Sequence, residues 1–130
     1  MTALTATNIQ YAKKSRMLTV TFSDDSRVDI PAELLRVYSP SAEVRGHGAD
    51  QSVLVRNKAA VEISKIGAVG NYAIQINFDD GHKTGIYQWS YLKELGENKT
   101  ALYEEYRQRC IAADSKEALK IPIQLSLIHI

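Results

Sequence analysis

The chain has 130 residues, 45% of them apolar and 24% charged, a composition typical of one folded domain and too apolar for a disordered segment. Its 16 Lys and Arg residues are balanced by 15 Asp and Glu residues, which argues against a dedicated nucleic-acid-binding protein. The single cysteine excludes an internal disulfide, and because no apolar run suits a membrane span or a signal peptide, we expect a cytoplasmic protein.

Four elements are predicted in the first part of the chain. In order, they are a weak edge strand over 8–11, a strand over 16–22, a return strand over 27–30 and a short helix over 32–37. Leu18, Val20 and Phe22 alternate with threonines, a period-two pattern typical of a half-buried strand. The acidic turn between the two strands favours a hairpin, and Pro31 suits the first position of the helix.

The second part of the chain follows the same order of elements. Strands are predicted over 53–56, 60–66, 72–78 and 84–88, followed by a short helix around Tyr91, Leu92 and Leu95 that is ended by Gly96. Residues 67–70 are interpreted as a turn, and residues 79–82 as a tight hairpin turn because Gly81 accepts a positive φ. A strand–turn–strand–short helix unit thus occurs twice, either as an internal pseudo-repeat or by chance.

One longer helix is predicted over residues 100–113, where apolar side chains recur at helical spacing. The fold class is therefore α+β: a small β-rich domain with two strand–turn–strand–short helix units and one longer C-terminal helix. The domain is predicted to span 1–113, and 114–130 is predicted to form an apolar, flexible tail. Three interpretations of the tail stay open: an added strand, a segment that binds a partner, or an end foreign to the natural protein.

Catalytic signatures are missing from the sequence. Histidines occur only at positions 47, 82 and 129, without the spacing of a two-histidine, one-carboxylate iron site. His82 beside Asp79 and Asp80 is a weak metal candidate, and a solvated turn explains these residues better. Cys110 lies on the apolar stripe of the last helix, where free cysteine is typically a small buried hydrophobe. We therefore predict no enzymatic activity and no cofactor.

A long polar loop between the two units offers candidate binding residues. Its directed donors are Arg36, Ser39, Ser41, Arg45 and His47. Arginines combined with hydroxyls and glycine N–H groups are suited to a carboxylate or a phosphate. The alternative is a solvated surface loop whose glycines set its path.

Three aromatic residues, Tyr87, Trp89 and Tyr91, form the other candidate cluster. Tyr87 and Trp89 are two positions apart and are expected to share one face of a strand. Tyr and Trp are common at the energetic centres of protein interfaces. The alternative is that at least one of them packs in the core beside the last helix.

Residues 35–48 (LRVYSPSAEVRGHG), 69–74 (VGNYAI) and 78–87 (FDDGHKTGIY) resemble the γ-butyrobetaine hydroxylase-like N-terminal domain family. The likeness extends over about residues 8–107, and the second and third segments together are specific. In full-length carnitine-pathway hydroxylases this domain is a β-rich, non-catalytic module that precedes an Fe(II)/2-oxoglutarate oxygenase domain. The resemblance implies a stand-alone bacterial form, because the chain has no oxygenase domain.

The resemblance also implies a structural zinc site held by three cysteines and one histidine. Those ligand positions correspond to Ser39, Ser41, Val44 and His82 in this sequence. Only His82 remains, so we expect that the zinc has been lost and that packing or hydrogen bonding in the loop replaces it.

The favoured hypothesis is a non-catalytic module that binds a partner protein or an anionic group through the 39–50 loop, His82, Tyr87 and Trp89. Related domains are fused to iron–sulfur carrier ATPases, so the alternative is an accessory protein of metal or iron–sulfur cofactor assembly. A subunit of a separate oxygenase is the third hypothesis. The expected partner is a protein, with self-association possible, and neither nucleic acid nor a membrane.

Overall fold

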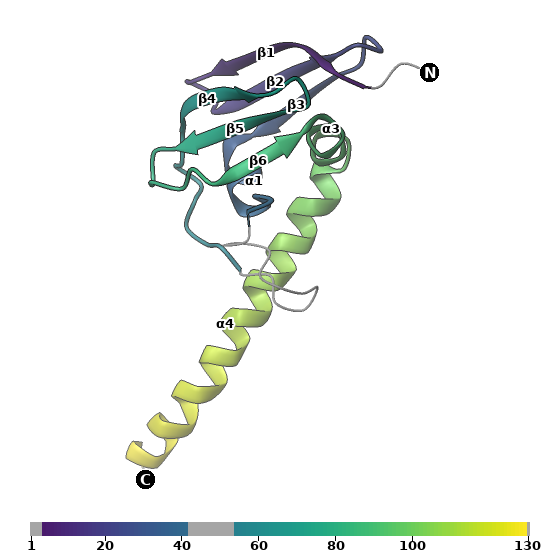
Figure 1. Cartoon of the computed structure of the whole chain (residues 1–130). Helices are drawn as coiled ribbons and strands as arrows, with labels where there is room; N and C mark the ends of the chain where they lie inside the picture. Colours follow the sequence, from purple (N-terminus) through teal and green to yellow (C-terminus); the bar gives the residue numbers. More distant parts are fainter. Residues whose placement is uncertain (1–3, 42–53, 130) are drawn as a thin grey trace. The chain divides into compact units, whose positions relative to one another are not determined.

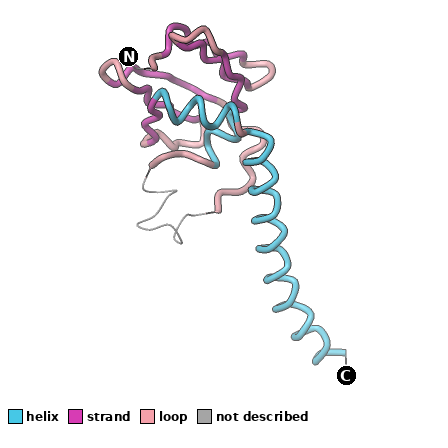
Figure 2. The backbone as a smooth tube through the Cα atoms, turned by 90° about the vertical axis from the view of Figure 1, so that its right-hand side faces the viewer, coloured by secondary structure: helices cyan, strands magenta, loops and turns pink. Residues whose placement is uncertain are grey.

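The structure is a computed structural model that describes residues 4–41 and 54–129, with side chains described up to Ser115. It divides into two compact units, Met1–Lys99 and Thr100–Ile130, each of which is described by itself. Figure 1 shows the first unit as two sheets with short helices, and Figure 2 shows the same backbone by secondary structure.

The first sheet contains β1 (Ala6–Ala12), β2 (Met17–Phe22) and β3 (Arg27–Pro31), antiparallel and in that order. Val20 lies opposite Val28, so the apolar residues of both strands point to one face. In the turn, Asp25 has a φ of 67°, and Asp24 Oδ1 accepts a hydrogen bond of 3.0 Å from the Ser26 N–H. The predicted hairpin and edge strand are both confirmed.

Helix α1 (Ala32–Val37) follows β3 and has the predicted bounds. Pro31 precedes the helix as its N-cap residue, with φ −63° and ψ 143°, so its predicted place at the first helical position is wrong by one residue. Leu34 and Leu35 are buried, which fixes α1 on the core through one apolar face.

The second sheet contains β4 (Ile63–Val69), β5 (Ala73–Phe78) and β6 (Gly85–Gln88), again antiparallel and in that order. Two predictions are corrected here. Residues 67–69 belong to β4 because they pair with β5, and the turn starts at Gly70, whose φ is +54°. Residues 54–56 form no strand, and Val53 lies outside the described residues.

Helix α3 (Trp89–Glu97) contacts β3 of the first sheet and β6 of the second. Gly96 lies within this helix, so the prediction that it ends the helix is wrong. A Cβ at Gly96 would lie 2.3 Å from Val28 Cβ, and glycine therefore allows α3 to approach β3. The helix ends at Glu97 and is capped by Asn98, whose N–H donates to Glu94 O at 3.0 Å.

The core lies among the two sheets, α1 and α3. Its largest fully buried side chains include Tyr87, Phe22, Leu18, Ile30, Leu34, Leu35, Ile76, Leu92 and Leu95. A hydrogen bond of 3.3 Å from the Ile63 N–H to Tyr11 Oη joins the two sheets. The strand–turn–strand–helix order occurs twice, as β2–β3–α1 and β5–β6–α3, and the predicted α+β class is confirmed.

The second unit consists of helix α4 (Lys99–His129). The helix predicted over 100–113 continues through the tail, which is helical rather than an added strand. Glu104 accepts hydrogen bonds from Gln108 at 3.0 Å and from Arg107 at 2.6 Å, which together lower the pKa of its carboxyl group. Within the described ranges, no helix combines the length and apolar character needed to cross a bilayer.

Candidate functional site

The structure separates the predicted binding residues into three groups. Arg45, His47 and Val44 lie outside the described residues. Ser39, Ser41, His82 and Tyr87 are all buried, with at most 6% of their surface exposed, while Arg36 and Trp89 are half-buried. The fold brings the buried residues together in the interior, although they come from distant parts of the sequence.

The His82 cluster, defined as Ser39, Ser41 and His82, is a triangle of buried polar side chains. His82 Nε2 lies 2.9 Å from Ser39 Oγ and 3.3 Å from Ser41 Oγ, and the two hydroxyl oxygens are 3.3 Å apart. The cluster connects the segment after α1 with the turn between β5 and β6.

Local backbone geometry places His82 in this cluster. Gly81 has a φ of +93°, which turns the chain after Asp80. The His82 N–H donates to Asp80 Oδ1 at 3.0 Å, and His82 O accepts from the Phe78 N–H at 2.8 Å. Gly85 leaves room for the cluster, since a Cβ at that position would lie 2.6 Å from Ser39 Oγ.

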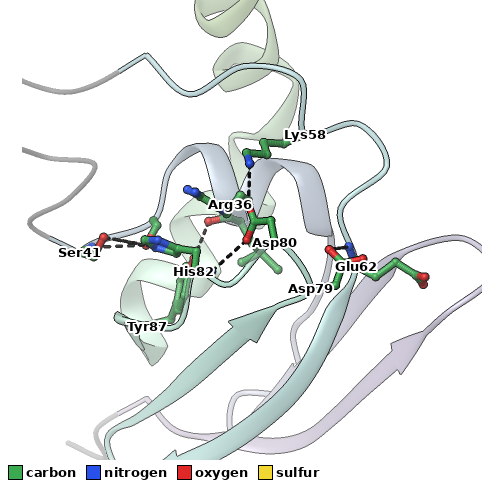
Figure 3. Close-up of polar contacts among 10 residues, drawn as sticks. Arg36, Ser41, Lys58, Glu62, Asp79, Asp80, His82 and Tyr87 are labelled. Carbon is green, nitrogen blue, oxygen red and sulfur yellow. Dashed lines mark hydrogen bonds and ion pairs between the residues drawn. The ribbon is translucent and has the colours of Figure 1, made fainter.

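Asp80 holds two cations beside the cluster. Its Oδ2 lies 2.8 Å from Arg36 Nε and 2.7 Å from Lys58 Nζ (Figure 3). Burial alone would raise the pKa of the Asp80 carboxyl group, but Lys58, the His82 N–H and Arg36 together hold this pKa well below its ordinary value. Arg36 Nη1 is buried without a hydrogen-bond partner. The positive charge of this region is thus already engaged by an internal carboxylate.

Two tyrosine hydroxyls anchor the end of α1 and the residue that follows it. Tyr87 donates to Leu35 O, and Tyr91 donates to Tyr38 O. Burial raises the pKa of the Tyr87 hydroxyl well above its ordinary value of 10.0, so it is a neutral donor. Both bonds hold the segment that leads into Ser39 against β6 and α3.

The donor chemistry of the His82 cluster does not fit a structural zinc ion. Such sites use thiolates and imidazoles as ligands, whereas the cluster offers two neutral hydroxyls and one imidazole that already contact one another. Nor do the described residues include any group of three His, Cys, Asp or Glu placed to hold a metal ion.

A second region lies on the surface beside the cluster. We call it the β6–α3 surface and define it by two hollows that share Gln88 and Ser90. The first, of about 420 Å³, is lined by Pro40, Ile86, Gln88, Ser90, Tyr91 and Glu94. The second, of about 390 Å³, is lined by Leu4, Tyr72, Gln88, Trp89 and Ser90. Ile86 is 44% exposed and Tyr72 is 53% exposed, so both present apolar surface to solvent.

The prediction that Tyr87 and Trp89 share one face of a strand is wrong. Tyr87 points inward from β6, whereas Trp89 begins α3 and donates from Nε1 to Asn71 O at 2.9 Å. The sequence pattern did not single out Ile86 and Tyr72 as surface residues. For Ile86 the signal was available, because a buried Tyr87 requires its strand neighbour to face the other way.

Residues 9–93 match the family described as gamma-butyrobetaine hydroxylase-like, N-terminal. Two NMR solution structures are similar to the chain. One is 45% identical, with a TM-score of 0.76 and coverage of 88% of each chain. The other is 41% identical, with a TM-score of 0.72 and coverage of 85% of this chain and 86% of that chain.

A crystal structure of a protein with unknown function from Acidithiobacillus ferrooxidans, which belongs to the DUF971 family, is also similar. It is 33% identical, with a TM-score of 0.60, and the match covers 71% of this chain and 92% of that chain. No curated protein matches the chain.

Proposed function

The chain belongs to the γ-butyrobetaine hydroxylase-like N-terminal family, and from that premise we propose that it is a non-catalytic module that binds a partner protein through the β6–α3 surface. The observation that carries the proposal is the exposed apolar surface of Ile86 and Tyr72 beside two adjoining hollows. Trp89 and Tyr91 also line these hollows, and both residue types are enriched where binding energy concentrates in interfaces.

The occupant that fits best is an extended segment of the partner. β6 is the last strand of its sheet, and Ile86 and Gln88 of this strand line the first hollow together with Pro40. An extended peptide beside an end strand gains main-chain hydrogen bonds and places alternate side chains in adjoining pockets. Among the described residues that line this hollow, Glu94 is the one that carries a charge, so a peptide with an apolar residue next to a lysine or arginine complements it.

Capture of a small anion has less support. Arg36 and Lys58 both pair with Asp80, and the other two cationic candidates lie outside the described residues. For cofactor assembly, the described part of the chain supplies no cluster of metal-binding side chains. Protein binding is therefore the function that we carry forward.

A displayed library of random peptides, selected against the full chain, tests this function. We expect enriched peptides that combine an apolar residue with a neighbouring basic residue. Ile86→Asp should weaken the binding of the purified peptide at least about tenfold, which corresponds to about 1.4 kcal/mol. Ile111→Asp is the matched control, because Ile111 is also exposed, at 49%, but lies in α4.

Peptides that bind the Ile86→Asp and wild-type proteins equally would contradict the proposed surface. A second copy of the chain is the other occupant to examine, by sedimentation of the wild-type and Ile86→Asp proteins. A dimer that becomes a monomer on this substitution would make the surface a homo-oligomer interface instead.

A further inference from the structure

We infer that the His82 cluster is a metal-free cross-link, which joins the segment after α1 to the β5–β6 turn through hydrogen bonds alone. Its three side chains form a triangle with nearly the size and shape of a metal site. This inference is independent of the proposed binding function. It assigns a role to Ser39 and Ser41 as a pair, and it predicts which substitutions would turn the triangle into a zinc site.

The polar groups of the triangle satisfy one another by hydrogen bonding. Ser39, Ser41 and His82 are 0%, 6% and 6% exposed, so water cannot satisfy them well. Each side chain lies within hydrogen-bond distance of the other two, and the Ser41 N–H also donates to Ser39 Oγ at 3.4 Å. A buried polar network whose members are all paired holds its chain segments in one arrangement.

The size of the triangle is close to that of a metal site. Its three edges measure 2.9, 3.3 and 3.3 Å. Three ligands of a tetrahedral zinc ion lie about 3.3 to 3.8 Å apart, given metal–ligand distances of about 2.0 to 2.3 Å. Two observed edges therefore lie at the short end of this range and the third lies below it, which suits hydroxyl groups in direct contact and leaves the same three positions near enough to surround a metal.

Both sides of the triangle are anchored by further hydrogen bonds. Tyr87 and Tyr91 hold the chain before Ser39 through Leu35 O and Tyr38 O. On the other side, the His82 N–H bonds to Asp80. The positions of the three side chains are therefore set by bonds outside the triangle, so a change from oxygen to sulfur should leave them close together.

The test is a titration of the full chain, without a polyhistidine tag, with Zn²⁺ alone. For the wild-type protein we expect no stoichiometric binding by calorimetry, and no change in melting temperature with a chelator. The double substitution Ser39→Cys and Ser41→Cys should bind one Zn²⁺ per chain and melt at a higher temperature when Zn²⁺ is added. His82→Ala in the double variant should abolish this binding.

The control is Ser64→Cys with Ser90→Cys, which adds two thiols at exposed serines. If the control binds as much zinc as the Ser39/Ser41 double variant, the positions in the triangle have no special suitability for a metal ion, and that part of the inference is wrong. Stoichiometric Zn²⁺ binding by the wild-type protein, lost in His82→Ala, would overturn the metal-free cross-link. The wild-type titration decides this point even if the double variant fails to fold.

Discussion

The His82 cluster and the β6–α3 surface have opposite characters. The first buries polar side chains, and the second exposes apolar ones, so both depart from the usual distribution of residues. Strand β6 divides them, because Gly85 and Tyr87 point inward while Ile86 and Gln88 point outward. The buried polar groups are satisfied by one another, which gives them a structural role. The exposed apolar groups have no such explanation within the described fold, and this contrast is why we assign binding to the surface.

The largest effect on stability is expected at Asp80. Asp80→Ala should lower the free energy of unfolding by about 3 kcal/mol, because it removes two charged contacts at once and leaves Arg36 and Lys58 without their partner in a partly buried place. Urea denaturation of the wild-type and variant proteins measures this loss. The control is Glu104→Ala, which removes an exposed ion pair with Arg107 and should leave stability nearly unchanged. Equal losses in the two variants would show that burial does not strengthen the Asp80 pairs.

The same carboxylate predicts a pH dependence. Because the pKa of Asp80 in the folded state lies below its ordinary value of 3.8, its contribution to stability is complete above about pH 4 and is lost as the pH falls further. The difference in unfolding free energy between wild type and Asp80→Asn should therefore be constant near neutral pH and shrink below about pH 4. A difference that stays constant down to pH 2 would contradict the depressed pKa.

A smaller loss is expected when Gly85 is replaced. Gly85→Ala would place a Cβ 2.6 Å from Ser39 Oγ and 3.0 Å from Tyr87 Cε1, and crowding of this kind costs about 1 to 3 kcal/mol. Gly67→Ala is the matched control, since nothing lies within 4 Å of its added Cβ. Thermal unfolding of both variants compares them directly, and a Gly85→Ala protein as stable as the control would mean that the cluster can shift without cost.

The two tyrosine anchors should differ from each other. Tyr87→Phe leaves Leu35 O without its donor in the fully buried interior, with an expected loss of about 1 to 2 kcal/mol. Tyr91 is only half-buried, so water can replace its hydroxyl and Tyr91→Phe should cost about 0.5 kcal/mol. Chemical denaturation of both variants checks the order, and the reverse order would contradict the division between interior and surface.

Local patterns predicted the parts of the fold that depend on neighbouring residues. The hairpin at residues 17–31, helix α1 and the turn at Gly81 all follow from alternation or turn chemistry within a few positions. Locally, a glycine indicates a turn or the end of a helix, and for that reason the predictions at Gly67 and Gly96 were wrong. Pairing with β5 places Gly67 in a strand, and close contact with Val28 explains the glycine at position 96. Such tertiary approaches leave no periodic trace in the sequence.

The candidate site was predictable only in part for the same reason. Ser39 and Ser41 are more than 40 positions from His82 in the sequence, and periodicity says nothing about contacts at that separation. The family resemblance supplied the pairing, and the structure places the three side chains together. The surface role of Ile86, in contrast, follows from alternation once Tyr87 is known to be buried. The sequence alone did not show which face of β6 is buried.

The smallest effect on stability is expected at Ile86, the residue whose exposure distinguishes the β6–α3 surface from the His82 cluster. Ile86→Thr keeps a β-branched residue in the strand and removes apolar surface that is already 44% exposed, so the unfolding free energy should change by less than about 0.5 kcal/mol. Ile76→Thr, in the adjacent strand and fully buried, is the matched control and should cost several times more because it places a hydroxyl in the core. Both values come from the same denaturation experiment. Equal losses of unfolding free energy would show that Ile86 contributes to the core, and its exposure would then no longer support a role in binding. A stable Ile86→Thr protein with weakened peptide binding would instead show that the His82 cluster stabilises the fold and that the β6–α3 surface recognises a partner.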